Sequence, residues 1–588
     1  MIRLDRVSFT YGIEQGQRPV PAVRALSMAI AAGEHVALIG RNGSGKSTIA
    51  RLMNGLLIPD EGTVTVNGMV TTDDDCLYDI RRSVGIVFQN PDNQIIGATV
   101  RDDVAFGPSN LGLPVEDILE RVRRALEVTG LTAMADRAPH ELSGGQKQKL
   151  AIASALAMHP DAIVLDEATA MLDPQARGDV IELIRQIRET MGLTVVNITH
   201  HMREASLADR IYVIDAGRIV LSGTPAEVFD QPERLTAAGL NLPVHMALAQ
   251  RIRAMTRRPY HREAVTTPEG AATYIRDALR RRPVDGGDAA PSAAEDAEPP
   301  LWRADRALRM RNVHFAYEAV DGSSVPALTD ISLDVQKGEV LGIVGHTGSG
   351  KSTLVQHING IIPAEPGTVE VLGRDLGNRK NVRAVRPRVG LLFQYPEDQL
   401  FEETVALDVA FAPKQFGKTP EQVECAVLSA VRRMNIEDLL DRSPFELSGG
   451  QRRRVAIAGV LAAEPEIIVL DEPTAGLDPG AQRALWADLM SLRDEGATLI
   501  IVSHDMEQIA EVADQMLVLE AGRIARMGRP EDVTDDPAWL ERVCLAMPAA
   551  KAMVLAVTGD AALASDAFTI DRAVLRMLQW ADRERGTP

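Results

Sequence analysis

Two segments of the chain carry the glycine and lysine spacing that binds nucleotide phosphates. Glycines let backbone N–H groups close around a β-phosphate, and the N-terminus of the following helix favours the anion. Each lysine is expected to reach the β- and γ-phosphates, and the serine after it to coordinate Mg²⁺. The two segments are Gly40-Arg41-Asn42-Gly43-Ser44-Gly45-Lys46-Ser47-Thr48 and Gly345-His346-Thr347-Gly348-Ser349-Gly350-Lys351-Ser352-Thr353.

An apolar run ending in two acidic residues follows each lysine. The runs are Ile163-Val164-Leu165-Asp166-Glu167 and Ile467-Ile468-Val469-Leu470-Asp471-Glu472. The first acid lies 120 residues after the lysine in both (166 − 46 and 471 − 351). We expect Asp166 and Asp471 to hold the Mg²⁺ shell, and Glu167 and Glu472 to polarise the attacking water.

A second anion-binding pattern precedes each acidic pair. Leu142-Ser143-Gly144-Gly145-Gln146 and Leu447-Ser448-Gly449-Gly450-Gln451 stand before helical patterns at 147–158 and 452–463. Glycine and serine expose backbone N–H groups at a helix start, which again suits a phosphate. One domain does not need two cradles for one γ-phosphate. We therefore interpret this cradle as closing over the nucleotide held by the other domain.

The phosphate-binding segments and the acidic pairs are expected to lie at the ends of short buried strands. His35-Val36-Ala37-Leu38-Ile39 and Val340-Leu341-Gly342-Ile343-Val344 lead into the phosphate-binding segments. Almost wholly apolar runs are typical of central parallel strands buried on both faces, and ligand sites open at the carboxyl ends of such strands. The sequence therefore predicts an α/β fold, with P-loop nucleoside triphosphatase domains.

The motifs occur twice at a nearly constant offset. The sequence positions of Lys46 and Lys351 differ by 305, and so do those of Ser143 and Ser448, the serines of the second anion-binding pattern, which we call the signature motif. Two histidines that each follow a later apolar run, His200 and His504, differ by 304. This repeat indicates two copies of one domain. We predict domains at 1–225 and 306–530, helical extensions at 226–280 and 531–588, and a flexible linker at 281–305 that is rich in Ala, Asp, Glu, Gly and Pro.

The amino-acid composition makes some classes of partner and some cellular settings less expected than others. The formal net charge of −19 disfavours general attraction to nucleic acid. The three cysteines, Cys76, Cys425 and Cys544, have no metal-ligand spacing, and a reducing compartment fits them. No uninterrupted apolar stretch reaches the roughly 18–20 residues that span a bilayer, so any membrane span is expected to come from another chain.

Taken together, these motifs resemble the ATP-binding cassette (ABC) superfamily over nearly the whole chain. The resemblance implies cassettes with a RecA-like core, an antiparallel β subdomain and a helical subdomain. It also implies further roles, residue by residue. Tyr11 and Tyr317 match the aromatic residue that stacks on adenine. Gln89 and Gln394 match the loop that senses Mg²⁺ and touches a transmembrane partner. Asp173 and Asp478 match the inter-domain D-loop, and His200 and His504 match the switch histidine at the γ-phosphate. A core tyrosine is the alternative for Tyr11 and Tyr317. In the first copy, His201 follows where the second copy has Asp505.

Two stretches are similar to the two different ATPases of energy-coupling factor (ECF) importers. These are residues 88–107 and 393–411. The first copy also reads Asp166-Glu167-Ala168-Thr169-Ala170-Met171-Leu172-Asp173, without the Pro and Gly of the second, and this departure is typical of one ECF ATPase. Acidic residues after each glutamine lie where the family's grooves receive coupling helices carrying arginine, although a solvated acidic surface explains them equally well. They are Asp92, Asp102, Asp103, Glu397, Glu402 and Glu403.

The resulting hypothesis is an ECF-type importer ATPase at the cytoplasmic face of the cell membrane. Its two cassettes would form an intramolecular heterodimer with two active sites, using ATP and Mg²⁺ to move a transmembrane coupling subunit. A separate membrane-embedded subunit would select a vitamin or transition-metal ion. The alternatives are the ATPase of another importer, for example for sugars, and a soluble tandem cassette protein acting on ribosomes or DNA. A scaffold that binds ATP without turnover is disfavoured by the paired Glu and His.

Overall fold

The computed structural model forms two compact units. Unit 1 comprises Met1–Met246, His261–Thr266 and Asp478–Gly480, and unit 2 comprises Ala247–Tyr260, Thr267–Leu477 and Ala481–Pro588. The described residues are 1–12, 19–170, 172–281, 305–318, 324–394, 399–447, 449–475 and 477–586. Most of the predicted linker, together with Met171, Glu397 and Ser448, lies outside them.

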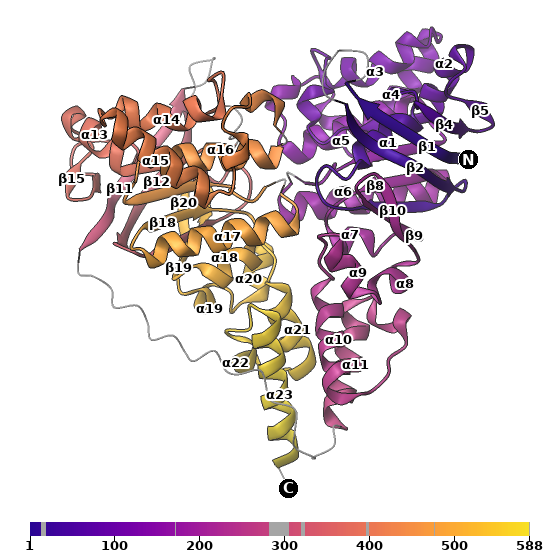
Figure 1. The fold of residues 1–588 in the computed structure, drawn as a ribbon. Helices are drawn as coiled ribbons and strands as arrows, with labels where there is room; N and C mark the ends of the chain where they lie inside the picture. Colours follow the sequence, from indigo (N-terminus) through magenta and orange to yellow (C-terminus); the bar gives the residue numbers. More distant parts are fainter. Residues whose placement is uncertain are drawn as a thin grey trace. The chain divides into compact units, whose positions relative to one another are not determined.

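Each copy of the repeat contains two sheets, as expected (Figure 1). In the first copy, a four-stranded antiparallel sheet has the order β2-β1-β4-β5, and a six-stranded sheet has the order β10-β9-β3-β8-β7-β6. Strands β6, β7, β8, β3 and β9 are parallel, and β10 is an antiparallel edge. The strands are β1 (Ile2–Tyr11), β2 (Val20–Ile30), β3 (His35–Ile39), β4 (Glu61–Val66), β5 (Met69–Val70), β6 (Val84–Val87), β7 (Ala162–Asp166), β8 (Thr194–Ile198), β9 (Arg210–Asp215) and β10 (Arg218–Gly223).

The second copy repeats this topology. Its antiparallel sheet has the order β12-β11-β14-β15, and its larger sheet has the order β16-β17-β18-β13-β19-β20. The strands are β11 (Arg306–Glu318), β12 (Ser324–Gln336), β13 (Val340–Val344), β14 (Val369–Val371), β15 (Arg374–Asp375), β16 (Val389–Leu392), β17 (Ile467–Asp471), β18 (Thr498–Val502), β19 (Gln515–Glu520) and β20 (Arg523–Gly528). Every residue of β13, β17 and β18 is buried, which explains their continuous apolar sequences.

Three helices of the first copy form a cluster with a core of its own. Helices α3, α4 and α5 pack on one another and share a core that includes Val104, Leu126 and Leu150. Helix α6 is capped at its N-terminus by Asp173, whose side chain accepts from the backbone of Ala176, and at its C-terminus by Gly192 in the left-handed region. The helices are α1 (Lys46–Met53), α2 (Asp74–Ser83), α3 (Val100–Asn110), α4 (Val115–Thr129), α5 (Gly144–Ala157), α6 (Pro174–Met191), α7 (Met202–Ala205), α8 (Pro225–Phe229), α9 (Pro232–Ala237), α10 (Val244–Thr256) and α11 (Pro268–Arg280).

The second copy has matching helices and a longer C-terminal set. Within unit 2, α11 packs against α21 and α23, and the Arg276 guanidinium donates to the Val557 carbonyl at 2.9 Å. The helices are α12 (Lys351–Ile358), α13 (Arg379–Val385), α14 (Val405–Gln415), α15 (Pro420–Arg433), α16 (Gly449–Leu461), α17 (Pro479–Asp494), α18 (Met506–Val512), α19 (Pro530–Val533), α20 (Pro537–Arg542), α21 (Ala549–Thr558), α22 (Ala561–Ala564) and α23 (Ile570–Gly586).

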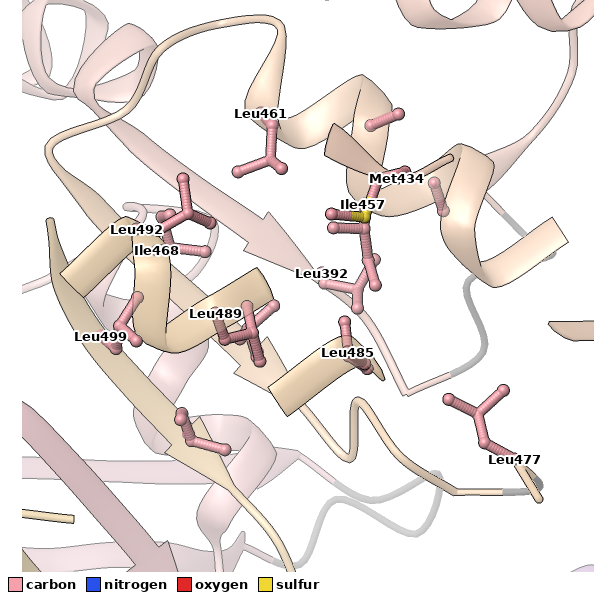
Figure 2. Close-up of a cluster of buried hydrophobic side chains, with 14 of the residues drawn as sticks. Leu392, Met434, Ile457, Leu461, Ile468, Leu477, Leu485, Leu489, Leu492 and Leu499 are labelled. Atoms are coloured by element: carbon pink, nitrogen blue, oxygen red, sulfur yellow. The ribbon is translucent and has the colours of Figure 1, made fainter. Parts of the chain in front are cut away.

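A continuous apolar core supports the second copy's functional loops. Figure 2 shows Ile457 and Leu461 of α16, and Leu485 and Leu489 of α17, around the strand residue Ile468. This packing fixes the two helices that flank the acidic strand end. Among the described helices, none is both long and apolar enough to cross a membrane.

Candidate functional site

Each phosphate-binding segment joins the end of a buried strand to a helix. Lys46 Nζ donates to the carbonyl oxygens of Gly40 and Arg41 at 2.8 and 3.0 Å. In the second copy, Lys351 Nζ donates to the Gly345 and His346 carbonyls at 2.7 and 2.9 Å. Each lysine thus folds back over its own loop, with its ammonium group held above the backbone N–H groups that suit a phosphate. Burial lowers the pKa of Lys46, opposed by the nearby Glu167 and Asp166.

The serine after each lysine is hydrogen-bonded to the first acid of the pair. Ser47 Oγ donates to Asp166 Oδ1 at 2.9 Å, and Ser352 Oγ donates to Asp471 Oδ2 at 2.7 Å. One hydroxyl and one carboxylate fit Mg²⁺, which takes few protein ligands when substrate phosphates complete its shell. No group of three or more His, Cys, Asp or Glu in the described part of the chain is arranged to hold a metal.

Both metal-candidate carboxylates are shielded from water. Burial raises the pKa of Asp166 above its ordinary value, despite the hydrogen bond from Ser47. Burial likewise raises the pKa of Asp471 from 3.8 to about 6. A buried carboxylate next to a hydroxyl and a lysine is poised to be stabilised by a cation.

The raised pKa of Asp471 predicts a pH-dependent loss of stability in the nucleotide-free protein. Between about pH 4 and 6 the native state retains a proton that the unfolded chain has released, so the free energy of unfolding falls as pH rises and stays low above pH 6. Asp471→Asn removes this ionisation. We expect the variant to exceed the wild type by up to about 3 kcal/mol at pH 8, with the difference vanishing near pH 4. Urea unfolding at the two pH values tests this; a difference independent of pH would contradict it.

The second acid of the first copy meets the other candidate catalytic groups. Glu167 Oε2 accepts from Gln89 Nε2 at 3.2 Å and lies 3.8 Å from His200 Nδ1, while Glu167 Oε1 lies 3.9 Å from Lys46 Nζ. Burial of Glu167 opposes its charge, but its interactions with His200 and Lys46 outweigh burial and lower the pKa. The carboxylate is therefore held ionised, as a base must be. His200, rather than the adjacent His201, is the histidine that faces it.

The second copy repeats this arrangement with a closer histidine. His504 Nδ1 lies 2.9 Å from Glu472 Oε2, and Ser503 Oγ donates to the same oxygen at 3.5 Å. The buried Arg453 of α16 adds a contact that motif spacing did not indicate. Its guanidinium donates to the carbonyl oxygens of Glu472 and Pro473 at 3.2 and 3.1 Å, and to that of Gln394 at 3.4 Å. In the sequence, Arg453 lies among three consecutive arginines that look like a solvated helix face.

Both candidate bases have an unusual backbone. Glu167 and Glu472 have φ of +52°, in the left-handed region that side chains other than glycine rarely adopt. The Glu167 N–H donates to Ile198 O and the Glu472 N–H to Val502 O, both at 2.9 Å. Strain that neighbouring strands enforce at this position is characteristic of functional sites, because it orients a side chain that relaxed geometry would turn away.

The two candidate adenine-stacking tyrosines have the same surroundings. Tyr11 Oη lies 3.2 Å from Thr48 Oγ1, and Tyr317 Oη lies 3.1 Å from Thr353 Oγ1, within hydrogen-bonding distance. Each ring also meets a phenylalanine edge-to-face, with centroids 4.9 Å apart. Both tyrosines are partly exposed (38% and 46%), so neither is a core residue.

We expect the ring, rather than the hydroxyl, to carry the nucleotide affinity. Tyr11→Phe and Tyr317→Phe keep the aromatic face and lose only the bond to threonine, so the ATP Kd should rise by less than about fivefold. Leucine at either position removes stacking and should raise the Kd by about tenfold or more. Titration with a fluorescent ATP analogue measures both; equal losses for Phe and Leu would argue that the hydroxyl makes the contact.

The first signature motif forms a capped helix start. Ser143 Oγ accepts from the Gln146 backbone, and Gln146 Oε1 accepts from the Ser143 backbone at 2.9 Å. Helix α5 therefore begins at Gly144, three residues earlier than the apolar pattern indicated, and the side chain of Gln146 serves the cap. S-x-x-Q is itself a capping signal that the sequence offered. In the second copy, α16 begins at Gly449, with Gly450 and Gln451 in its first turn.

The prediction that Asp103 is one of the acidic residues of a partner-binding groove is wrong. Asp103 is 4% exposed, accepts from the backbone N–H groups of Ile96 and Gly97 at 2.8 and 3.0 Å, and accepts from Ser154 Oγ at 2.8 Å. Its oxygens thus hold the loop after Gln89 and do not face a partner. Asp92 is exposed and pairs with Lys147 at 2.7 Å, and Glu402 and Glu403 remain near the surface.

Comparison with known proteins agrees with the repeat. A family model described as ABC transporter matches residues 23–170 and 328–475. A protein of Caldanaerobacter subterraneus subsp. tengcongensis, named "Putative ABC transporter ATP-binding protein", is 33% identical over 541 residues, covering 90% of this chain and 92% of that protein. One of the same name from Bifidobacterium longum is 35% identical over 538 residues, and this chain covers 65% of its length. A solved structure of cbiO1 from Clostridium perfringens, titled as part of the ABC transporter complex cbiONQ, is 35% identical and covers 42% of this chain and 98% of its own, with a TM-score of 0.37.

Proposed function

Because the chain belongs to the ABC transporter family and carries two ATPase cassettes, we propose that it is the energy-coupling ATPase of an ECF-type importer. ATP is the substrate, and in this proposal each of the two cassettes carries all the side chains that ATP hydrolysis needs. The import role, the residue assignments and the membrane partners are the parts of this proposal that experiments must test.

In each cassette, a small set of residues is assigned to hydrolysis. Lys46 and Lys351 bind the phosphates, and the Ser47–Asp166 and Ser352–Asp471 pairs hold Mg²⁺, which neutralises phosphate charge when bound. Glu167 and Glu472 accept a proton from the attacking water. His200 and His504 orient these carboxylates and contact the γ-phosphate. The Ser–Asp hydrogen bonds and the His–Glu contacts within each cassette support these assignments, since they join the groups that the chemistry requires.

The Ser-Gly-Gly cradles are assigned to the opposite nucleotide. Ser143-Gly144-Gly145 would close on ATP held by Lys351, and Ser448-Gly449-Gly450 on ATP held by Lys46, with Asp173 and Asp478 at the junction. This follows from the need for only one loop cradle per nucleotide in each cassette. Binding of ATP would draw the cassettes together, and hydrolysis would release them.

The ECF assignment depends on two features of the sequence. The stretches after Gln89 and Gln394 differ from each other in the way the two ECF ATPases differ. The first copy also replaces the usual Pro after its catalytic glutamate with Ala168. A fusion of unequal partners accounts for both.

A groove in the second copy is the observation that supports a membrane partner most directly. A cavity of about 770 Å³ extends from Ser352 and Asp471 past Gln394 to α14 and α16, which with α15 form the helical subdomain of the second copy. Its walls carry Phe393, Phe401, Phe411 and Phe416, all at least 37% exposed. Exposed aromatic groups in one groove mark an interaction surface. A groove between the nucleotide site and the helical subdomain suits an apolar helix that is moved by nucleotide turnover.

Isolation of the protein from native membranes tests the proposal. We expect the full chain to co-purify with a small transmembrane protein and a second, substrate-binding membrane protein, identified by mass spectrometry. Phe401→Ser should reduce this recovery by about tenfold, whereas Tyr78→Ser, which removes an equally exposed aromatic from α2, should not. Recovery with a solute-binding sugar importer, or sedimentation with ribosomes, would replace the ECF proposal.

A further inference from the structure

In both copies, a side-chain hydrogen bond links the loop that follows the catalytic glutamate to the helix that follows the switch histidine; the bond is buried in the first copy and partly buried in the second. In the first copy, Thr169 Oγ1 donates to Glu204 Oε1 at 2.6 Å, and Asn197 Nδ2 donates to Glu204 Oε2 at 3.4 Å. Glu204 is 2% exposed and stands on α7, four residues after His200. Both carboxylate oxygens therefore accept from uncharged donors inside the protein.

The second copy builds the same tie with a neutral residue. Thr474 Oγ1 donates to Gln508 Oε1 at 2.9 Å, and the Trp486 indole N–H donates to the same oxygen at 3.0 Å. Gln508 follows His504 by four residues, so it occupies the position of Glu204 (204 + 304 = 508). The amide nitrogen of Gln508 donates onward to Gln482 Oε1 at 2.9 Å.

The same loop is also held from the helix that follows it. In the first copy, the Arg177 guanidinium donates to the carbonyls of Thr169 and Leu172 at 3.4 and 3.2 Å. In the second copy, Gln482 Nε2 donates to the equivalent carbonyls of Thr474 and Leu477, at 3.4 and 3.0 Å. The chain thus makes one arrangement twice, with a carboxylate and a guanidinium in the first copy and two amides in the second.

We propose that Glu204 and Gln508 are positioning residues for ATP hydrolysis, acting through Thr169 and Thr474. The threonine stands two residues after the catalytic glutamate, and the glutamate or glutamine stands four residues after the switch histidine. Their hydrogen bond therefore joins the two segments that must present base and histidine together. This inference rests on the assignment of Glu167 and Glu472 as bases.

The strained backbone explains why such a tie has an effect on rate. Glu167 and Glu472 sit at φ of +52°, a conformation that relaxes unless the loop is held on both sides. One side is the strand, through the backbone bond to Ile198 or Val502. The threonine bond holds the other side, together with the contacts from Arg177 in the first copy and Gln482 in the second. Loss of the bond lets the loop relax and misplaces the base, which affects the chemical step more than nucleotide binding.

The two copies differ in what remains when the threonine hydroxyl is removed. Valine is nearly the same shape as threonine and removes only the donor. In the first copy, Thr169→Val removes the shorter of the two hydrogen bonds that the buried Glu204 carboxylate accepts. In the second, Thr474→Val leaves a neutral amide oxygen that still accepts from Trp486. An unsatisfied charged group is the more destabilising of the two, so the first copy should respond more strongly.

The test compares matched variants of the purified full chain by steady-state ATPase kinetics. We expect Thr169→Val to lower kcat about tenfold and Thr474→Val about threefold, with the KM for ATP within about twofold of wild type in both. Thr169→Ser and Thr474→Ser keep the hydroxyl and should retain most of the wild-type kcat. Adding Glu204→Gln to Thr169→Val replaces the stranded charge with an amide and should raise kcat to the level expected for Thr474→Val, about threefold below wild type, because the threonine bond is still absent.

Other results overturn the proposal. Serine variants as slow as the valine variants would show that packing, not the hydrogen bond, matters. A loss that appears in KM rather than kcat would indicate an effect on nucleotide binding and not on the placement of the base. If Glu167→Gln turned over ATP normally, the base assignment itself would fail, and this result is separable because it does not involve either threonine.

Discussion

Glu167→Gln and Glu472→Gln are each expected to lower ATP turnover by about 10²-fold or more while leaving ATP binding intact. Glutamine keeps the shape of the side chain and its contacts with the neighbouring histidine, but its amide does not accept the proton of the attacking water. The phosphate loop, with Lys46 or Lys351 folded over it, is untouched. Release of inorganic phosphate and equilibrium binding of ATP, measured on the same preparations, separate the two effects.

The matched pair also tests whether both cassettes turn over. Every expected catalytic residue is present in both copies, and each histidine lies within 3.8 Å of its glutamate. Wild-type turnover in either single variant would refute two active sites. A severe loss in both would show that the two sites depend on each other, because independent sites would leave the share of the rate that the unchanged cassette supplies.

Gly45→Ala and Gly350→Ala should abolish measurable ATP binding. These glycines adopt φ of +104° and +102°, and an added Cβ would lie 2.4 Å from the Ala22 carbonyl oxygen or 2.5 Å from that of Ala327. Neither backbone atom is free to move, because Ala22 and Ala327 belong to strands β2 and β12 of the antiparallel sheets. The loop must therefore open, which removes its N–H groups from the phosphate, and we expect the Kd for ATP to rise about 100-fold or more.

Two other glycines serve as controls for this prediction. Gly43 also has a positive φ, of +75°, but a Cβ there meets nothing within 4 Å, so Gly43→Ala should weaken binding less, by about tenfold. Gly178 lies in helix α6 with open space around it, and Gly178→Ala should leave ATP binding at the wild-type level. Isothermal titration with ATP orders the series; equal binding by the Gly45 and Gly178 variants would contradict the steric argument. Circular dichroism confirms that each variant is folded.

Local residue patterns were sufficient to predict the fold and most of the candidate site. Strands β3, β7, β13 and β17 are buried on every residue, so their apolar runs had only one interpretation, and the motif spacing repeats within one residue. The phosphate loops bind their own backbone, so their geometry depends on a few consecutive residues. The proximity of Ser47 and Asp166 was also predictable, because each residue belongs to a motif that was expected to hold the same Mg²⁺ ion.

Tertiary structure alone decided which residues hold the site in shape. The sequence placed Asp103 among surface acids, but packing of α3 against α5 buries it, and its carboxylate holds the loop after Gln89. Arg453 belongs to none of the motifs, yet its guanidinium donates to the carbonyl oxygens of Glu472 and Pro473. Glu204 and Gln508 carried no motif at all. Each of these polar side chains acquires its role from partners distant in sequence, because burial obliges it to find hydrogen bonds wherever the fold supplies them. The chemical groups are therefore encoded in short motifs, whereas their positioning depends on contacts that only the assembled cassette creates.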